Sequence, residues 1–308
     1  MNQKSQSAME YLMTYGWSIL IIAVILSALA YLGVFNPLYF APKANPGSCQ
    51  VFRPNGAGTS YEINILGVCS NEIPEYAATF NGKDSLVNFG NGAMLSPEAG
   101  ANGAMTFCMW YRVNSYTGYA GPMIKGELSP SNGNSWEYTM DQGGGSEGFT
   151  IWNGGGGNIA SASSDYFSYA DLQGKWVFAC FTYNYAAGNA DYYVGYSSLG
   201  YSNLLQFSSG VANGPATAGT GNFVIGAGEG GYSAVSIADM QMYNSSLDYP
   251  SVNALYQEGI GGVPIDLHNL VGWWPLNGNA NDYSGNGNNG VPTNILFANS
   301  WMSGYSAP

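Results

Sequence analysis

The chain has 308 residues, and only 8% of them are charged, against about 25% in an average soluble protein. Seven Lys and Arg against 19 Asp and Glu leave a formal net charge of −12. This balance excludes nucleic-acid binding, because such a protein needs a basic face to neutralise phosphates. Glycine contributes 44 residues and tyrosine 24, and aromatic residues reach 15%. The composition therefore predicts a folded, low-charge, mainly β protein of a kind common outside cells.

The N-terminal part of the chain contains one long apolar segment. Residues 11–42 include no Asp, Glu, Lys or Arg, and Trp17 to Phe35 is almost wholly apolar. About 20 such residues cross a bilayer as a helix, and Asn36 with Pro37 would end it. The apolar run is longer than that of an ordinary secretory signal peptide. We therefore expect one long hydrophobic helix over residues 6–36.

The residues ahead of this segment, Lys4-Ser5-Gln6-Ser7-Ala8-Met9-Glu10-Tyr11-Leu12, resemble the class III signal peptide of archaeal type IV pilin-like proteins. In that family a prepilin peptidase cuts ahead of the apolar helix, which implies a cut between Ser5 and Gln6. Ser5 departs from the family, which usually carries Gly there. Glu10, the fifth residue after the cut, matches a glutamate of the family and is implied to pair with the N-terminal amine of a neighbouring subunit. Opposite charges in an apolar bundle are tolerable only together.

The resemblance divides the chain into four parts. Residues 1–5 are the signal peptide, 6–36 form the membrane or filament-core helix, 37–48 are a linker, and 49–308 form the outer domain. A helix that has lost its signal peptide can leave the bilayer and bundle with copies of itself. The small residues of this helix permit such close packing.

Beyond Pro42, short strand-like runs alternate with turn clusters about every ten residues, as in an all-β sandwich. The expected strands are residues 106–113, 149–152, 176–183, 190–196, 222–225 and 234–243. One short helix is expected over Tyr249 to Gln257, because Pro250 lies in its first turn and Gly259 just after its end.

The strand segments resemble, in order, those of laminin G-like (concanavalin A-like) jelly rolls. The matching segments are 76–89, 105–113, 174–183, 223–226 and 237–256. A further segment, Leu270-Val-Gly-Trp-Trp-Pro-Leu-Asn-Gly, looks like the opening of such a domain, although it stands near the C-terminus. Because the first and last strands of the family are neighbours, we predict one circularly permuted jelly-roll β sandwich over residues 49–308, with its first strand at 270–290. A truncated second repeat is a poorer explanation, because it would leave Trp273 and Trp274 unburied.

The loop Asn277 to Gly290 is rich in oxygen ligands and glycine, which suits Ca²⁺. The family resemblance implies a structural calcium here, with Asp282 and Asp239 as carboxylate ligands. The alternative is a turn-rich loop without metal.

Catalysis is not expected. The chain has one histidine, His268, so a histidine pair cannot form within it, and neither zinc nor Ser-His chemistry has support in the sequence. Glu137, Asp141 and Glu147 lie in a glycine-rich stretch and are expected to be solvated loop charges. A carboxylate pair across neighbouring strands stays open.

Four cysteines suggest two disulfides in an oxidising exterior. We favour Cys49 with Cys69, because the two close a short segment. Cys108 and Cys180 form either a second bridge or two buried thiols. Asn244 begins an N-glycosylation sequon, Asn-Ser-Ser, in an expected turn.

Tyrosines abound in the expected loops, and an exposed tyrosine can stack on a sugar ring. The candidates are Tyr116, Tyr119, Tyr166, Tyr169, Tyr196, Tyr201 and Tyr232. Packing between subunits explains them equally well.

The sequence as a whole predicts a pilin-like surface subunit. Its helix would assemble with other pilin-like subunits, and its head would mediate adhesion by binding glycans or another cell surface. The precursor would lie in the cell membrane, and the mature form on the cell surface or in a filament. The alternative is a monomeric, membrane-anchored extracellular lectin-like protein that does not assemble.

Overall fold

A computed structural model describes residues 15, 18–27, 49–54, 60–65, 76–115, 120–126, 135–140, 146–153, 157–211, 214–228, 230–298 and 303–308. The chain divides into two compact units, Met1–Ala44 and Asn45–Pro308.

The first unit is helical at Tyr15 and over residues 18–27. The large aliphatic side chains of this helix are about half exposed or more on every side, from 49% at Leu26 to 66% at Ile19. Within the described residues no helix is both long and apolar enough to cross a membrane. Ser5, Gln6, Glu10 and the remainder of the expected helix over residues 6–36 lie outside the described residues.

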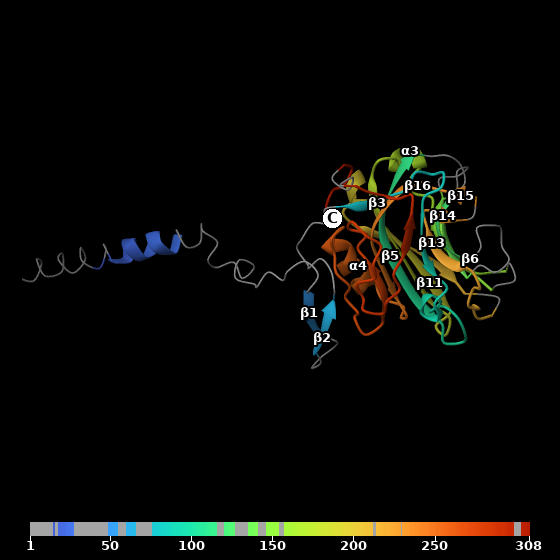
Figure 1. The fold of residues 1–308 in the computed structure, drawn as a ribbon. Coiled ribbons are helices and arrows are strands. Elements are labelled where there is room, and N and C mark those ends of the chain that lie inside the picture. The colour runs from blue at the N-terminus through green and yellow to red at the C-terminus, as the bar shows by residue number, and fades with distance from the viewer. Residues whose placement is uncertain are drawn as a thin grey trace, which may run out of the picture. The chain divides into compact units, whose positions relative to one another are not determined.

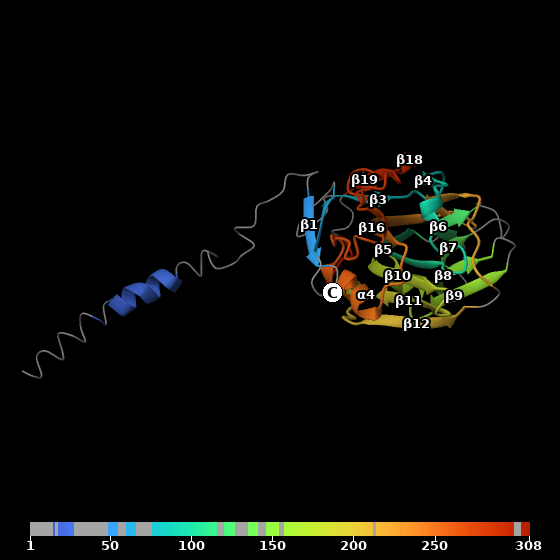
Figure 2. The same cartoon turned by 90° about the horizontal axis from the view of Figure 1, so that it is seen from below.

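The second unit contains a sandwich of two antiparallel sheets (Figures 1 and 2). The first sheet has eight strands in the order β12-β11-β10-β5-β16-β3-β19, and β17 also pairs with β16. These strands are β3 (Ala77–Thr79), β5 (Ala104–Ser115), β10 (Trp176–Asn184), β11 (Asn189–Gly195), β12 (Leu204–Gly210), β16 (Ala234–Tyr243), β17 (Leu270–Trp274) and β19 (Leu296–Ala298).

The second sheet has seven strands in the order β18-β4-β13-β6-β7-β8-β9. They are β4 (Leu86–Gly90), β6 (Ala120–Gly126), β7 (Trp136–Met140), β8 (Glu147–Trp152), β9 (Asn158–Ser164), β13 (Asn222–Ile225) and β18 (Val291–Thr293). Two further pairs are β1 (Cys49–Pro54) with β2 (Ser60–Ile65) and β14 (Ala227–Gly228) with β15 (Gly231–Tyr232). The helical elements of this unit are η1 (Ala93–Leu95), α3 (Tyr169–Leu172), η2 (Ser197–Leu199) and α4 (Tyr249–Glu258).

The expected strands are all present. β13 and β16 have the predicted bounds, the other four predicted segments overlap β5, β8, β10 and β11, and α4 is one residue longer than predicted. These elements confirm the prediction of a mainly β, jelly-roll-like sandwich.

Aromatic side chains join the two sheets. Alternate residues of each strand point inward, and facing sheets about 10 Å apart are filled by interdigitating side chains. Phe149 of β8 stacks on Phe181 of β10 with ring centroids 4.4 Å apart. Phe89 of β4 meets Trp274 of β17 edge-on at 4.9 Å. Both contacts cross from one sheet to the other, so the core lies between the sheets.

The outer face of the first sheet is covered by α4, and the C-terminus lies near this helix in both views (Figures 1 and 2). Asp248 caps the helix by accepting from the backbone N–H of Ser251 at 3.1 Å. Tyr256 lies buried over Gly195, where a Cβ would come within 2.2 Å of the Tyr256 ring. The tail contributes Tyr305, whose ring meets Trp110 of β5 edge-on at 5.4 Å. A second apolar cluster therefore closes this face of the sheet.

The segment expected as a displaced first strand forms β17. It pairs antiparallel with β16, with Met240 opposite Trp274 and Gln241 opposite Trp273. Both tryptophans are buried, Trp274 between the sheets and Trp273 under the outer cluster. The strand thus lies beside β16, as the burial argument requires, whereas its origin by circular permutation stays a prediction.

Candidate functional site

An exposed aromatic platform lies near α3 and η2. It consists of Tyr166, Phe167 and Tyr201; Tyr166 is 51% exposed and Tyr201 42% exposed. The Tyr166 ring meets Phe167 at 5.0 Å and Tyr201 at 5.8 Å, both edge-on, and Phe167 lies 5.2 Å from Tyr201. Neighbouring exposed tyrosine rings offer a ligand both apolar faces and hydroxyl groups, so this cluster is the strongest candidate for a binding surface.

Short local bonds set the positions of these rings. The backbone N–H of Tyr166 donates to the side-chain oxygen of Ser164, the last residue of β9, at 3.2 Å. η2 ends at Gly200 with φ 85°, a conformation that glycine adopts without a Cβ clash. The chain then turns back, and the N–H of Tyr201 donates to the carbonyl of Tyr196 at 3.2 Å. Both exposed rings are therefore held by backbone contacts.

Buried Tyr196 connects the platform to a carboxyl group inside the sandwich. Its ring contacts Phe167 at 4.7 Å and Tyr166 at 6.2 Å. Its hydroxyl donates to Oε1 of Glu147 at 2.6 Å. The other oxygen of Glu147 accepts from the hydroxyls of Tyr111 and Tyr138. A polar network with this many donors is rigid, so the platform has a fixed base.

Burial raises the pKa of Glu147, and the tyrosine hydroxyls that donate to it oppose the rise. The pKa values of Tyr111, Tyr138 and Tyr192 are raised well above 10, first by burial and then by the nearby Glu147. The hydroxyls consequently stay protonated and available as donors.

The prediction that Glu137 and Glu147 are solvated loop charges is wrong. Both lie in strands and are almost fully buried, 2% and 1% exposed. Met140 points into the core and is directly opposite Glu147, so Glu147 also points inward. Glu137 is next to Tyr138, which points into the core, so Glu137 points outward. The two carboxyl groups therefore leave opposite faces of the sheet and do not form a pair. Asp141 lies outside the described residues.

Of the other candidate tyrosines, Tyr196 is buried rather than exposed, and Tyr232 packs half-buried against the small cluster at β14 and β15. Tyr116, Tyr119 and the side chain of Tyr169 lie outside the described residues. Among the candidates whose side chains the structure describes, only Tyr166 and Tyr201 combine exposure with a neighbouring ring. The sequence marks them as tyrosines in loops, but their meeting depends on the turn at Gly200.

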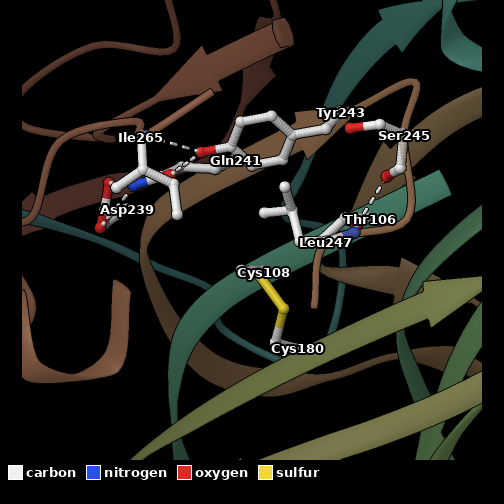
Figure 3. The surroundings of a disulfide bond; sticks show 9 residues. All are labelled: Thr106, Cys108, Cys180, Asp239, Gln241, Tyr243, Ser245, Leu247 and Ile265. Carbon is white, nitrogen blue, oxygen red and sulfur yellow. Dashed lines mark hydrogen bonds between the residues drawn. A yellow bond between two sulfur atoms is a disulfide. The ribbon is translucent and has the colours of Figure 1, made fainter. Parts of the chain in front are cut away.

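Cys108 of β5 and Cys180 of β10 are directly opposite in the ladder and form a disulfide (Figure 3). The bridge alternative is thus confirmed for this pair. Cys49 is the first residue of β1, and Cys69 lies outside the described residues, so their pairing stays a prediction.

A chain of polar side chains runs along β16 near the disulfide (Figure 3). The hydroxyl of Tyr243 donates a hydrogen bond to Oε1 of Gln241 at 2.6 Å, and Nε2 of Gln241 donates to the carboxyl of Asp239 at 3.2 Å. The indole N–H of Trp273 donates to the same carboxyl at 2.9 Å. Burial raises the pKa of Asp239 to about 7 despite these donors, and the charge of Glu258 adds to the rise.

The other expected calcium ligand, Asp282, organises its own loop. Its Oδ1 accepts from the backbone N–H groups of Trp273 at 3.1 Å and Ser284 at 2.9 Å, and its Oδ2 accepts from that of Asn288 at 2.9 Å. These three bonds use three of the about four lone-pair sites of the carboxylate and fix its orientation in the loop. No group of three or more His, Cys, Asp or Glu in the described part of the chain could hold a metal. Calcium binding by Asp282 and Asp239 stays a prediction.

Asn244 is exposed at a bend just after β16, and glycosylation there stays a prediction. His268 is exposed in a turn before β17.

Residues 81–253, more than half of the chain, match a laminin G family model described as the concanavalin A-like lectin/glucanases superfamily. The chain belongs to this superfamily. The match ends ahead of β17, so the superfamily strand pattern covers the sandwich up to α4. No curated protein is detectably similar in sequence.

Several solved structures are similar to this chain at low identity. The binding domain of botulinum neurotoxin serotype D has 15% identity and a TM-score of 0.44, over 70% of this chain and 52% of its own. The NanB sialidase from Streptococcus pneumoniae has 15% identity and a TM-score of 0.43, over 59% of this chain and 27% of its own. Tailspike protein 2 of an Escherichia coli O157:H7 bacteriophage has 16% identity and a TM-score of 0.43, over 78% and 31%. The chain thus spans about half or less of these proteins.

Proposed function

We propose that the sandwich is a glycan-binding head and that the aromatic platform is its contact surface. The observation that carries this proposal is the pairing of two exposed tyrosine rings, Tyr166 and Tyr201, on a base fixed by Tyr196 and Glu147. A sugar ring presents an apolar face that stacks on such rings and hydroxyls that bond to their phenols. Membership in a superfamily of lectins and glucanases supports the same reading.

The proposal is binding without catalysis. Glycoside hydrolysis uses two carboxyl groups that flank the scissile bond. The inward Glu147 has both oxygens engaged by tyrosine hydroxyls, and Glu137 leaves the opposite face of its sheet. Glycan turnover by the purified chain would overturn this part of the proposal.

A pair of variants tests the platform. Tyr166→Ala and Tyr201→Ala should each weaken binding on an array of neutral and sialylated oligosaccharides about tenfold, the equivalent of one lost stacking contact. Tyr249→Ala is the matched control, because Tyr249 is a similarly exposed tyrosine, 41% exposed, on α4. Near-ultraviolet circular dichroism checks that each variant is folded. If all three variants bind glycans as tightly as each other, the platform is not the binding surface. If only Tyr249→Ala loses binding, the site lies on α4.

We further propose that the head is carried by a pilin-like helix that assembles with copies of itself at the cell surface. The exposed aliphatic side chains all round residues 18–27 support this, because a helix that is apolar on every side needs a membrane or other helices around it. The signal peptide, its removal by a prepilin peptidase and the pairing role of Glu10 are proposed from the resemblance at the N-terminus.

Mass spectrometry of the N-terminus of the native protein distinguishes this proposal from a monomeric anchored lectin. A chain that starts at Gln6 is expected, and an intact Met1 would refute processing. Glu10→Ala should remove the subunit from filaments while the head keeps its fold, measured by immunogold labelling of surface filaments. Normal filaments in that variant would contradict the assembly role of Glu10.

A further inference from the structure

One lysine is held inside the sandwich near its rim. Lys125, on β6, is fully buried. Its two neighbours in the ladder are Phe223 of β13 and Trp136 of β7, both also fully buried. Residues directly opposite each other in a ladder place their side chains on the same face, so the lysine stem leaves the sheet on the same face as these two aromatic rings. Burial in this apolar setting lowers the Lys125 pKa, whereas the charge of Glu98 raises it.

The amine of Lys125 meets the side-chain amide of Asn91. Nζ donates to Oδ1 of Asn91 and also to the backbone carbonyls of Gly221 at 2.6 Å and Gly219 at 3.3 Å. Asn91 follows β4, and its Nδ2 donates to the carbonyl of Thr220 at 2.8 Å. The amide is thus held with its oxygen towards the amine and its nitrogen towards the loop.

Residues 219–221 run close against β6 beside this meeting point. A Cβ on Gly221 would come within 2.2 Å of the carbonyl carbon of Gly126, the residue after Lys125. Only glycine allows so close an approach of the loop to β6. The amine is consequently held against one amide group, and a fixed geometry of this kind replaces an encounter in solution.

A buried acid lies close by. Glu98 is fully buried, and its Oε1 accepts a hydrogen bond from the hydroxyl of Ser135. The backbone N–H of Ser135 in turn donates to the backbone carbonyl of Lys125. Among the described residues none donates to its Oε2. Burial raises the pKa of Glu98 to about 7, and the bond from Ser135 and the Lys125 charge oppose the rise. A group with this pKa takes up and releases a proton near neutral pH.

We propose that Lys125 and Asn91 become joined by an isopeptide bond. The neutral amine Nζ attacks Cγ of Asn91, the bond from Cγ to Nδ2 breaks, and Nδ2 leaves as ammonia. The proton lost by Nζ ends on the departing nitrogen, and Glu98 is the nearby acid–base group that carries it. No oxidant, reductant or other reactant is consumed. The amine and the primary amide become a secondary amide and ammonia.

The bond would connect strands that are not neighbours. β13 lies between β4 and β6 in the second sheet, so a link from Lys125 to Asn91 spans β13 and closes a segment with a sequence separation of 34. Such a covalent bond holds β4 and β6 together even when their hydrogen bonds to β13 break. It is independent of glycan binding, so its test does not depend on the proposed function of the head.

Peptide mapping of the purified full chain tests the bond directly. After reduction and alkylation, trypsin should cut after Lys83, Arg112 and Lys175 but not after the acylated Lys125. The expected product is peptide 84–112 joined to peptide 113–175, lighter than the sum of the two by one ammonia. Recovery of separate peptides 84–112, 113–125 and 126–175 as the main products would overturn the proposal.

Three variants define the participants. Lys125→Arg keeps the positive charge and Asn91→Ala removes the amide, and both should give unlinked peptides. Glu98→Gln should stay unlinked while keeping the native circular dichroism spectrum; linkage at the wild-type rate would remove Glu98 from the reaction. The matched control is Lys83→Arg, which changes an exposed lysine outside the cluster and should link fully. The decisive measurement is made on the wild-type chain, so a variant that fails to fold does not affect it.

Discussion

Replacement of Asp239 by Asn should remove a pH dependence from the stability of the sandwich. Asp239 is buried under α4 and the tail, with Gln241 and Trp273 as donors and with Glu258, Tyr243 and Tyr305 as the titratable groups around it. Burial raises its pKa from 3.8 to about 7. Between these two pH values the folded chain keeps the proton and the unfolded chain releases it. The free energy of unfolding therefore falls as the pH rises through this window.

The magnitude follows from the shift. A pKa difference of one is worth about 1.4 kcal/mol, so the rise at Asp239 is worth about 4 kcal/mol over the whole window and about 3 kcal/mol between pH 5 and pH 8. Glu98, whose pKa burial also raises to about 7, contributes with the same sign. The wild type should therefore lose stability between pH 5 and pH 8, and Asp239→Asn should lose about 3 kcal/mol less.

Guanidinium unfolding at pH 5 and pH 8, followed by tryptophan fluorescence, measures both slopes. Asp165→Asn is the control, because it makes the same substitution at an exposed aspartate. A wild type and an Asp239→Asn variant with the same loss between the two pH values would refute the reasoning.

Three further changes test other parts of the fold. Replacing Cys108 and Cys180 by Ser should cost about 4 kcal/mol in guanidinium unfolding, because the bridge closes a sequence separation of 72; an unchanged midpoint would contradict it. Asp282→Ala should cost about 2 kcal/mol, since three backbone N–H groups lose their acceptor; a melting temperature that rises with calcium in the wild type but not in this variant would instead make the loop a calcium site. Gly226→Ala should cost about 3 kcal/mol or more, because its φ is +84° and a Cβ would lie 2.0 Å from the Phe80 ring. Gly90→Ala is the control: its φ is +76° but its Cβ would point into open space, so it should cost only about 1 kcal/mol. Equal losses of stability in the two variants would show that the Phe80 contact is unimportant.

The sequence predicts the strands well because each of them contains its own signal. β13 and β16 are runs of apolar and β-branched residues bounded by turn residues, and both are found at their predicted bounds. The place of β17 beside β16 follows from the family resemblance, in which the first and last strands are neighbours, and its pairing buries both Trp273 and Trp274. Local pattern and burial therefore account for most of the framework.

The polar interior could not be predicted in this way. Glu147 stands just after a run of glycines, which indicates a loop, yet its partners Tyr111 and Tyr196 are 36 and 49 residues away. These hydroxyls reach one carboxyl only because β5 and the end of β11, in the first sheet, pack against β8 of the second sheet. The same holds for Cys108 and Cys180, whose bridge depends on their being directly opposite in the ladder. Composition gives the residue types, but pairing across the sheets decides their roles.

Buried acids also change the meaning of the formal net charge. The value of −12 counts every carboxyl group as ionised, yet burial raises the pKa of Glu98 and Asp239 to about 7 and raises that of Glu147 as well. At neutral pH a substantial fraction of Glu98 and Asp239 is therefore protonated, and none of the three acids lies at the surface. The folded chain therefore carries less negative charge than its sequence states, and unfolding at neutral pH releases protons as these groups reach water. The low charge of the sequence is thus lower still at the surface of the folded head, where stacking on aromatic rings rather than attraction between charges would hold a ligand.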